Sequence, residues 1–323
     1  MTNLSKRFLR GRPMRLETSA TLTQILTAMS ATPPDLASLR SGWGSIDEDP
    51  DLFGTVAVQP PATTPAILPA VAGRRPDLLA ARLYWFYENT SRVRGATNLG
   101  PRYGITGTDV LISDEGSGSF LLVVATLNAV DIDTTVIPAV QAAVASIDPG
   151  VIIKSLRSSL HFEDADFFLW MVRQAFAQQD IGTDIEVDGM DRLSIQDALD
   201  QQTSIARGVN VNRVELLTLL ASSTKVLGPT TLSITVAPWD FSMEFQLALN
   251  GEFDISVKSI KYKGVTFAST AEMRLQAVTD LIFVLLPSMK AAYEADTTWR
   301  SGVDRDAFRA AMKARAVSDV GRL

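Results

Sequence analysis

Apolar residues recur at helical spacing in several segments of this chain. In the first of these segments, Leu22, Ile25 and Met29 would share one face of a short helix that Pro33 closes. A strongly apolar segment, 76–87, begins with a Pro-Asp pair that suits the start of a helix. The pattern predicts helices over 18–30, 76–87, 135–147, 163–179, 211–221, 270–293 and 304–315.

Shorter apolar runs predict strands. The runs 109–113 and 119–127 flank a glycine-containing turn, and their lack of polar alternation predicts a hairpin buried on both faces. A further strand is predicted over 151–156. The runs 231–236, 241–249 and 253–262 follow one another closely, which is typical of an antiparallel meander.

The last turn of this meander determines which side chains share a face. A two-residue turn would place Leu247 opposite Asp254 and so mix apolar and polar residues on one face. A three-residue loop, 249–251, with Gly251 in the left-handed conformation, places Leu247 opposite Phe253 instead. The sequence therefore predicts the three-residue loop.

The first quarter of the chain differs in composition from the rest. Residues 41–73 combine an acidic cluster with several prolines among Thr and Ala, which predicts a linker. We expect residues 1–75 to be a flexible segment with a basic, amphipathic start. Residues 76–323 are expected to form a single α+β domain, with a mixed or antiparallel sheet that ends in the meander and is packed by several helices.

Composition limits the classes of protein to consider. The 323 residues are 46% hydrophobic, which excludes global disorder, and the formal charge of −6 restricts contact with nucleic acid to a local patch. The chain has no cysteine, so disulfides and thiolate metal sites are excluded, and a reducing cytoplasm fits most simply. The longest apolar run, 281–286, is far shorter than the roughly 20 residues of a membrane span, and none is expected.

Catalytic motifs are weak or missing. There is no Gly-Lys pair and hence no P-loop, and the Gly-Ser-Gly sequence at 116–118 is interpreted as a turn. The single histidine, His161, has Ser158, Ser159 and Asp164 close by in the sequence, but triad members usually come from separate segments. We therefore interpret His161 as a surface or capping residue, and expect no cofactor.

Acidic residues offer one candidate metal site. Asp184, Glu186 and Asp188 alternate with apolar residues, so their carboxylates would lie on one side of an extended segment and could hold Mg²⁺ or Ca²⁺. Together with Glu163 and Asp166 they could form a metal-dependent hydrolase site. The favoured alternative is the solvated face of an edge strand.

Two groups of cations are candidates for binding phosphate or nucleic acid. One group lies in a glycine-containing segment, and the other repeats every four residues along the C-terminal helix, beside an apolar stripe. A solvated loop and a solvated helix face are the alternatives. The six candidates are Arg92, Arg94, Arg102, Arg305, Arg309 and Lys313.

The absence of a convincing catalytic motif favours a non-enzymatic interaction or assembly protein. In this hypothesis the N-terminal segment tethers the chain, and the α+β domain binds a protein partner or a second copy of itself. Two other hypotheses are a nucleic-acid-binding accessory factor that uses the arginine-rich segments, and a carboxylate-metal-dependent hydrolase.

Overall fold

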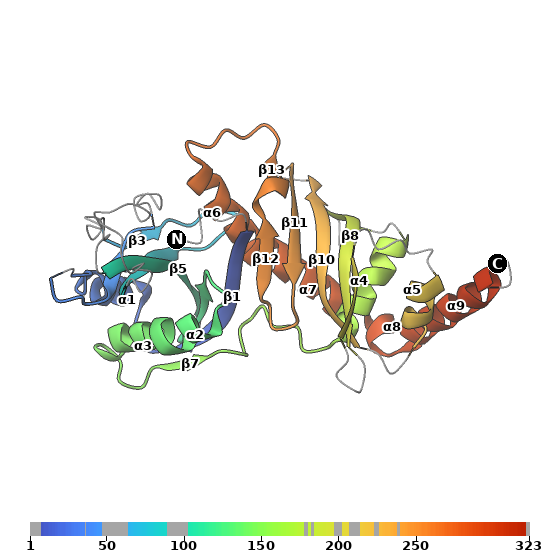
Figure 1. Ribbon diagram of the computed structural model, residues 1–323, viewed down its shortest axis with the longest axis horizontal. Helices are drawn as coiled ribbons and strands as arrows, with labels where there is room; N and C mark the ends of the chain where they lie inside the picture. The colour runs from blue at the N-terminus through green and yellow to red at the C-terminus, as the bar shows by residue number, and fades with distance from the viewer. Residues whose placement is uncertain are drawn as a thin grey trace, which may run out of the picture. The chain divides into compact units, whose positions relative to one another are not determined.

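The computed structural model shows an α+β fold with antiparallel strands, which confirms the predicted fold class (Figure 1). The chain divides into two compact units, Met1–Ser159 with Ala268–Asp280 and Leu160–Phe267 with Leu281–Leu323. The units therefore do not divide at the predicted boundary before Pro76. The structure describes residues 8–35, 37–46, 64–88, 103–177, 180–181, 184–196, 202–206, 214–222, 226–237 and 240–320.

The first unit contains a sheet with the strand order β2-β4-β5-β6-β1, in which neighbouring strands are antiparallel. In addition, β3 pairs with β4, and β7 pairs with β1. The strands are β1 (Phe8–Glu17), β2 (Gly42–Gly44), β3 (Ala66–Leu68), β4 (Leu78–Glu88), β5 (Tyr103–Gly116), β6 (Ser119–Val124) and β7 (Ile152–Lys154). The helices are α1 (Leu22–Ser30), α2 (Ala129–Asp131), the π-helical turn η3 (Ile132–Val136), α3 (Ile137–Ala145) and α6 (Thr270–Asp280).

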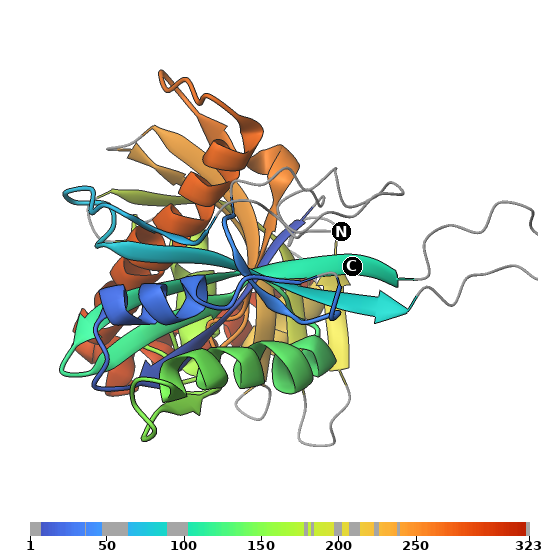
Figure 2. The ribbon, with the colours of Figure 1, turned by 90° about the vertical axis from the view of Figure 1, so that its left-hand side faces the viewer.

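One face of this sheet carries α1 and α3, which run beside the strands in Figure 2. Ile25 and Met29 of α1 join Val140 and Val144 of α3 in one buried cluster with apolar side chains of the sheet. Thr21 caps α1, because its hydroxyl accepts a hydrogen bond from the Gln24 N–H. The spacing of these apolar residues predicted both helices correctly.

The segment predicted as a helix at 76–87 is instead the strand β4. Leu79 and Leu83 lie in the cluster beneath α1 and α3, whereas Leu78 and Tyr84, on the opposite face of the strand, are equally buried. A strand buried on both faces has no polar alternation, and its continuous apolar run resembles that of a buried helix. The helix prediction was wrong for this reason.

The expectation of a flexible N-terminal segment is also wrong for Phe8–Glu17, which forms β1 along the edge of β6. Leu9, Met14 and Leu16 are buried, whereas the arginines between them are partly or fully exposed. Because side chains alternate along a strand, Leu9 lies on one face, and Met14 and Leu16 lie on the other. The cations that suggested a basic tether are therefore solvated side chains within a strand that contributes buried residues to both faces.

The hairpin predicted around residues 114–118 is confirmed as β5 and β6, and both of its strands are buried on both faces. Its turn at Gly116, Ser117 and Gly118 has φ values of 87°, 55° and 73°, so the Gly-Ser-Gly sequence serves a tight turn. The hairpin is central in the first unit's sheet, as expected.

A buried ion pair joins β4 to β5. Arg82 and Asp109 are directly opposite each other, with side-chain exposures of 0% and 5%. The Arg82 Nη2 to Asp109 Oδ2 distance is 3.2 Å, and the Arg82 Nε also donates to this carboxylate. Burial alone would lower the pKa of Arg82, but the charge and hydrogen bond of Asp109 outweigh it and raise the pKa.

Replacing one partner of this pair should be more damaging than replacing both. Arg82→Met leaves the Asp109 carboxylate buried without its cation, and we expect the free energy of unfolding to fall by about 3–5 kcal/mol. Arg82→Met combined with Asp109→Leu removes both charges and should restore part of that loss. Urea denaturation of the three proteins measures this, and an additive double variant would contradict it.

The second unit contains a sheet with the strand order β12-β11-β10-β8-β9, and β13 pairs with β11. Its strands are β8 (Ile185–Gln196), β9 (Gln202–Ala206), β10 (Val226–Val236), β11 (Phe241–Leu247), β12 (Phe253–Ser256) and β13 (Lys261–Tyr262). Its helices are α4 (Asp166–Ala177), α5 (Val214–Leu220), the π-helical turn η6 (Leu281–Leu285), α7 (Leu286–Ala295), α8 (Thr297–Arg300) and α9 (Val303–Val320), and a 3-10 turn, η5 (Val257–Ser259), follows β12. The predicted C-terminal meander is confirmed as β10, β11 and β12.

The predicted register of the last hairpin is confirmed. Phe245 faces Ile255 and Leu247 faces Phe253, and all of these side chains are buried. Gly251 has a φ of 80° and donates its N–H to the carbonyl of Ala248 at 2.9 Å. The three-residue loop therefore keeps the apolar face of the meander in the core.

The left-handed conformation makes Gly251 a position where a β-branched side chain is strained. We expect Gly251→Val to lower the free energy of unfolding by about 1 kcal/mol or more. Asn tolerates this conformation better, so Gly251→Asn should cost distinctly less. Urea denaturation of both variants measures the difference, and equal losses would contradict the conformational cause.

The prolines at 138 and 287 mark irregular turns in two helical runs. Each is near the first position of an α-helix that directly follows a π-helical turn, η3 before α3 and η6 before α7. Proline lacks an N–H and clashes with the carbonyl four residues earlier, which disfavours a regular α-helical turn at this place. The helix predicted over 270–293 is therefore interrupted by η6 just before Pro287.

The described residues contain one helical run, Thr270–Ala295, that is long and apolar enough to span a membrane by length and composition. Half of its most apolar stretch is buried inside the protein. Buried helices of water-soluble proteins satisfy the same criteria. The run is therefore no clear membrane span.

Candidate functional site

The structure describes only one of the two groups of cations that were candidates for binding phosphate or nucleic acid. Arg92, Arg94 and Arg102 lie outside the described residues. Arg305 and Arg309 lie on α9, and both form ion pairs with Asp166 in the first turn of α4. These two arginines connect helices and are not free cations for a phosphate.

The link to Asp166 uses both of its carboxylate oxygens. The Arg305 Nη1 donates to Oδ2, and the Arg309 Nη2 donates to Oδ1 at 3.3 Å. Between 18% and 26% of the three side chains is exposed. Asp166, which the hydrolase hypothesis uses as a metal ligand, is therefore occupied by two guanidinium groups.

A second charged link joins α4 to the helices that follow it. The Arg173 Nη1 is 2.9 Å from Asp296 Oδ2, and its Nη2 is 3.1 Å from Asp304 Oδ2. The guanidinium carbon also lies 5.4 Å from the centre of the Trp299 ring. Asp296 caps α8, because its carboxylate accepts a hydrogen bond from the Trp299 N–H.

The inner face of α9 packs on this framework. Phe308 contacts Phe176 of α4 and Trp299 of α8, with ring centres 6.0 Å apart in each case. Met312 and Ala316 continue the stripe and are buried. The predicted apolar stripe at Phe308 and Met312 is therefore the packed side of the helix.

The opposite face of α9 is apolar and has no covering element among the described residues. Val303 and Val317 are each 68% exposed, and the alanines between them on the same side of the helix are also exposed. We call this set the outer face of α9. It consists of Val303, Ala307, Ala310, Ala314 and Val317.

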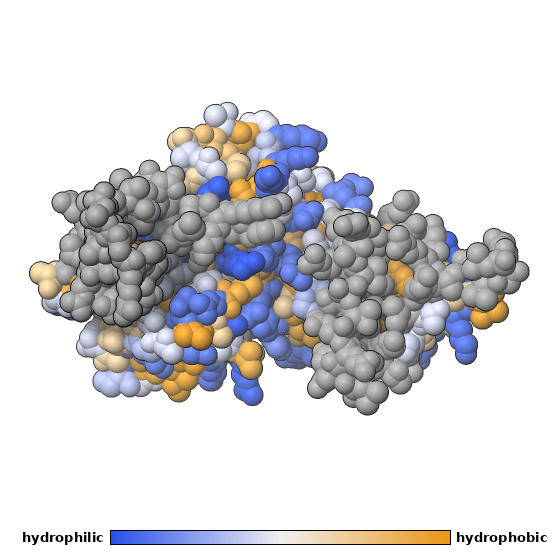
Figure 3. Space-filling model, viewed as in Figure 1, coloured by the Kyte–Doolittle hydropathy of each residue, from blue (hydrophilic) through white to orange (hydrophobic). Residues whose placement is uncertain are grey.

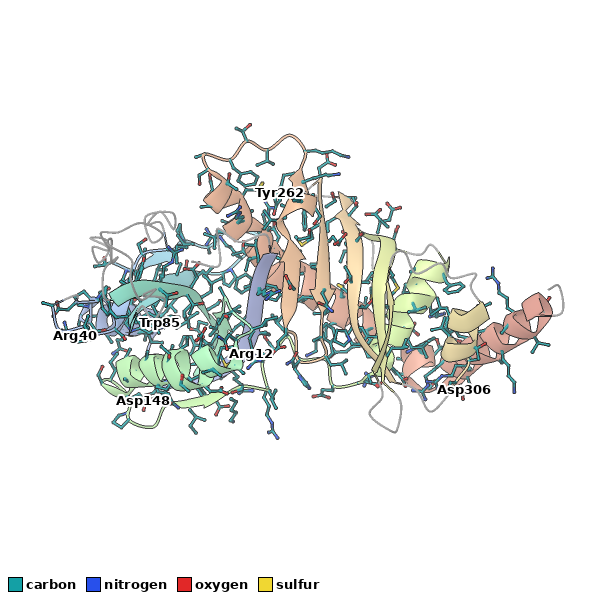
Figure 4. All side chains as sticks on the ribbon, viewed as in Figure 1. Arg12, Arg40, Trp85, Asp148, Tyr262 and Asp306 are labelled. Atoms are coloured by element: carbon teal, nitrogen blue, oxygen red, sulfur yellow. The ribbon has the colours of Figure 1, made fainter. Side chains whose placement is uncertain are left out.

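Charged residues flank the outer face on one side. Asp306 and Lys313 are exposed, and neither side chain has an ion-pair partner in the part of the chain that the structure describes. Figure 4 labels Asp306 near the start of α9, and Figure 3 shows apolar surface beside strongly polar surface around this helix. The sequence alone identified Lys313 as a candidate but missed the outer face.

A groove of about 430 Å³ lies between α5 and α9, next to the outer face. Its lining is mainly apolar, with Lys313 as the charged residue among those that line it. The lining residues are Thr218, Ala221, Ser222, Lys313, Ala316 and Val317. Groove and outer face thus form one continuous surface on the second unit.

The three acidic residues considered as a metal site lie along an exposed stretch at the start of β8. Asp184, Glu186 and Asp188 are all exposed, and the Asp188 carboxylate accepts a hydrogen bond from the Thr235 hydroxyl at 2.7 Å. Within the described ranges, no three acidic or histidine side chains are grouped so that they could hold a metal ion. The arrangement favours the solvated face of a strand.

His161 has neighbours that do not resemble a catalytic triad. Its backbone carbonyl accepts a hydrogen bond from the Lys290 ammonium at 3.0 Å. Asp164, the candidate orienting acid, accepts one from the Tyr293 hydroxyl at 2.6 Å. Burial, with Asp164 as the second cause, strongly raises the pKa of Tyr293. Asp164 therefore serves as the hydrogen-bond acceptor for a buried tyrosine.

In comparisons with known proteins, the sequence matches no protein-family model and no curated protein.

The carboxylate of Asp296 should make part of the second unit's stability depend on pH. Burial raises the pKa of Asp296, but hydrogen bonds from the Trp299 N–H, Trp170 and Thr298 and the charge of Arg173 lower it further, and the net shift is downward. Its contribution is then complete above the unfolded pKa of about 3.9 and disappears as the pH falls through the lower folded value.

We therefore expect Asp296→Asn to be less stable than the natural chain at pH 7, with a difference that shrinks below about pH 4. Glu294→Gln is a matched control, because Glu294 is exposed on the same segment and its side chain has no ion pair among the described residues. Urea denaturation across a pH series measures the difference, which would be constant with pH if the charge of Asp296 were irrelevant.

Proposed function

We propose that this chain is a non-enzymatic interaction protein that binds a protein partner through the outer face of α9. The observation that carries the proposal is this exposed apolar face on a helix that is firmly attached to its unit. The proposal includes a cytoplasmic location, which is compatible with a cysteine-free chain.

The attachment of α9 supports a role in recognition. Ion pairs from Asp166 and Arg173 and the packing of Phe308 hold the helix in one orientation. The outer face is therefore preorganised for binding. Ordering it costs less conformational entropy on binding than ordering a flexible segment would. The alanines on the outer face allow a second helix to approach closely.

The two other hypotheses have less support. Electrostatic binding of nucleic acid needs several clustered cations, and two of the three candidate cations on α9 already bind Asp166. Lys313 is then the one candidate cation of this helix without such a partner. The hydrolase hypothesis depends on carboxylates that are exposed and not grouped as metal ligands among the described residues or, at Asp166, engaged by arginines.

A charge placed on the outer face should abolish partner binding. We expect Ala310→Glu to prevent co-purification of protein partners from an extract of the native host, because the carboxylate would have to be buried in the interface. Ala291→Glu, on the exposed side of α7, is the matched control and should leave binding unchanged. Nuclease-treated extract and quantitative mass spectrometry make the comparison specific for proteins.

Two outcomes would contradict the proposed function. One is that both variants retain the same partners as the natural chain, which would show that α9 is not the interface. The other is that nuclease treatment removes every partner and that binding to nucleic acid falls steeply with salt, which would favour the accessory-factor hypothesis.

A further inference from the structure

Some charged side chains of α9 face the rest of the unit, and others lie beside the outer face. Arg305 and Arg309 face α4 and are paired with Asp166, and Asp304 is paired with Arg173. Asp306 and Lys313 flank the outer face and are unpaired among the described residues. The two charges are opposite in sign, but they are about 10 Å apart along the helix, too far for a direct pair within it.

The outer face has the spacing of a coiled-coil seam. Val303, Ala307, Ala310, Ala314 and Val317 are separated by alternating steps of four and three residues. This repeat places apolar residues on one line along a helix, where they can pack between the side chains of a second helix. The residues just outside such a seam determine the orientation of the partner through their charges.

An antiparallel second copy of α9 satisfies both the seam and the charges. If Ala307 packs opposite the partner's Ala310, then Val303 lies opposite the partner's Ala314. The same register brings Asp306 close to the partner's Lys313, and two-fold symmetry produces this ion pair twice. The unpaired charges of one protomer are thus complementary to those of the other.

A parallel pair of α9 helices does not use these charges. In a parallel coiled coil, a flanking residue faces the partner residue five positions further along the chain. Asp306 would then face Ala311 and Lys313 would face Ser318, so no opposite charges would meet. The charge pattern therefore selects the antiparallel arrangement.

We propose that α9 binds a second copy of this chain, as an antiparallel helix pair held by an alanine-rich seam and two reciprocal Asp306–Lys313 ion pairs. This inference rests on the proposed function, because it identifies the partner of the same outer face. The seam is short and its charges are solvated, so the dimer is weak and dissociates as the salt concentration rises.

Charge reversal tests this dimer in the full-length protein. Sedimentation equilibrium should show that Asp306→Lys and Lys313→Asp each weaken dimerisation by roughly tenfold or more, because each substitution turns two attractions into two repulsions. The double variant Asp306→Lys/Lys313→Asp should dimerise like the natural chain. An equimolar mixture of the two single variants should also form heterodimers, because one chain then presents two cations and the other two anions.

Disulfide formation tests the register independently, because the chain has no cysteine of its own. A mixture of Val303→Cys and Ala314→Cys proteins should form a mixed disulfide under mild oxidation. Val303→Cys alone should not, because the two copies of residue 303 are about 16 Å apart in the antiparallel register.

Three results would overturn the inference. The natural chain could remain monomeric at all concentrations, its dimer could be insensitive to both charge reversals, or Val303→Cys alone could crosslink readily. The first result, combined with Ala310-dependent capture of another protein, would refute the homodimer and leave the proposed function intact. If the natural chain is monomeric and no other protein is captured in an Ala310-dependent way, the proposed function is refuted as well.

Discussion

The account of the second unit depends on two charged side chains of α4, Asp166 and Arg173. Asp166 binds the two arginines of α9, and Arg173 binds Asp296 before α8 and Asp304 in α9. These pairs determine which side of the C-terminal helix faces inward. Phe308 and Met312 then pack against the unit, and the alanines of the helix face outward. Because these ion pairs are partly exposed, each adds little to the free energy of unfolding. Their main effect is to set the orientation of α9.

The first unit uses its charges in a similar way. Arg82 and Asp109 form a buried pair between neighbouring strands. Asp280, at the end of α6, is buried and accepts hydrogen bonds from Arg74 at 2.7 Å and from Gln276 at 2.8 Å. Buried ionised groups are tolerated when they are paired in this way. In both units, these charged side chains therefore join one element to another. An exposed apolar surface is then a better candidate for binding a partner than these charges are.

How much of this structure the sequence could predict depended on whether a segment was buried on one face or on two. The meander, its three-residue loop and the helices at 22–30 and 137–145 were predictable, because each alternates between a buried and a solvated side. Residues 78–84 were misassigned because they are buried on both faces of their strand. Phe8–Glu17 was missed for another reason, because the arginines among its buried residues were interpreted as a basic tether. Spacing alone also could not show that Asp166 holds two arginines from a helix far away in the sequence. The outer face was missed because alanine is too weakly apolar to reveal a seam without knowledge of which side of the helix is packed.

Hydrogen–deuterium exchange of the natural chain at increasing protein concentration tests most directly the central claim that the outer face of α9 binds a second copy of this chain. If α9 pairs with a second copy, peptides covering 303–317 should become more protected as the concentration rises, while the meander stays unchanged. Added salt should reverse this protection. Exchange in α9 that is independent of concentration, or protection that appears only when nucleic acid is added, would contradict the account.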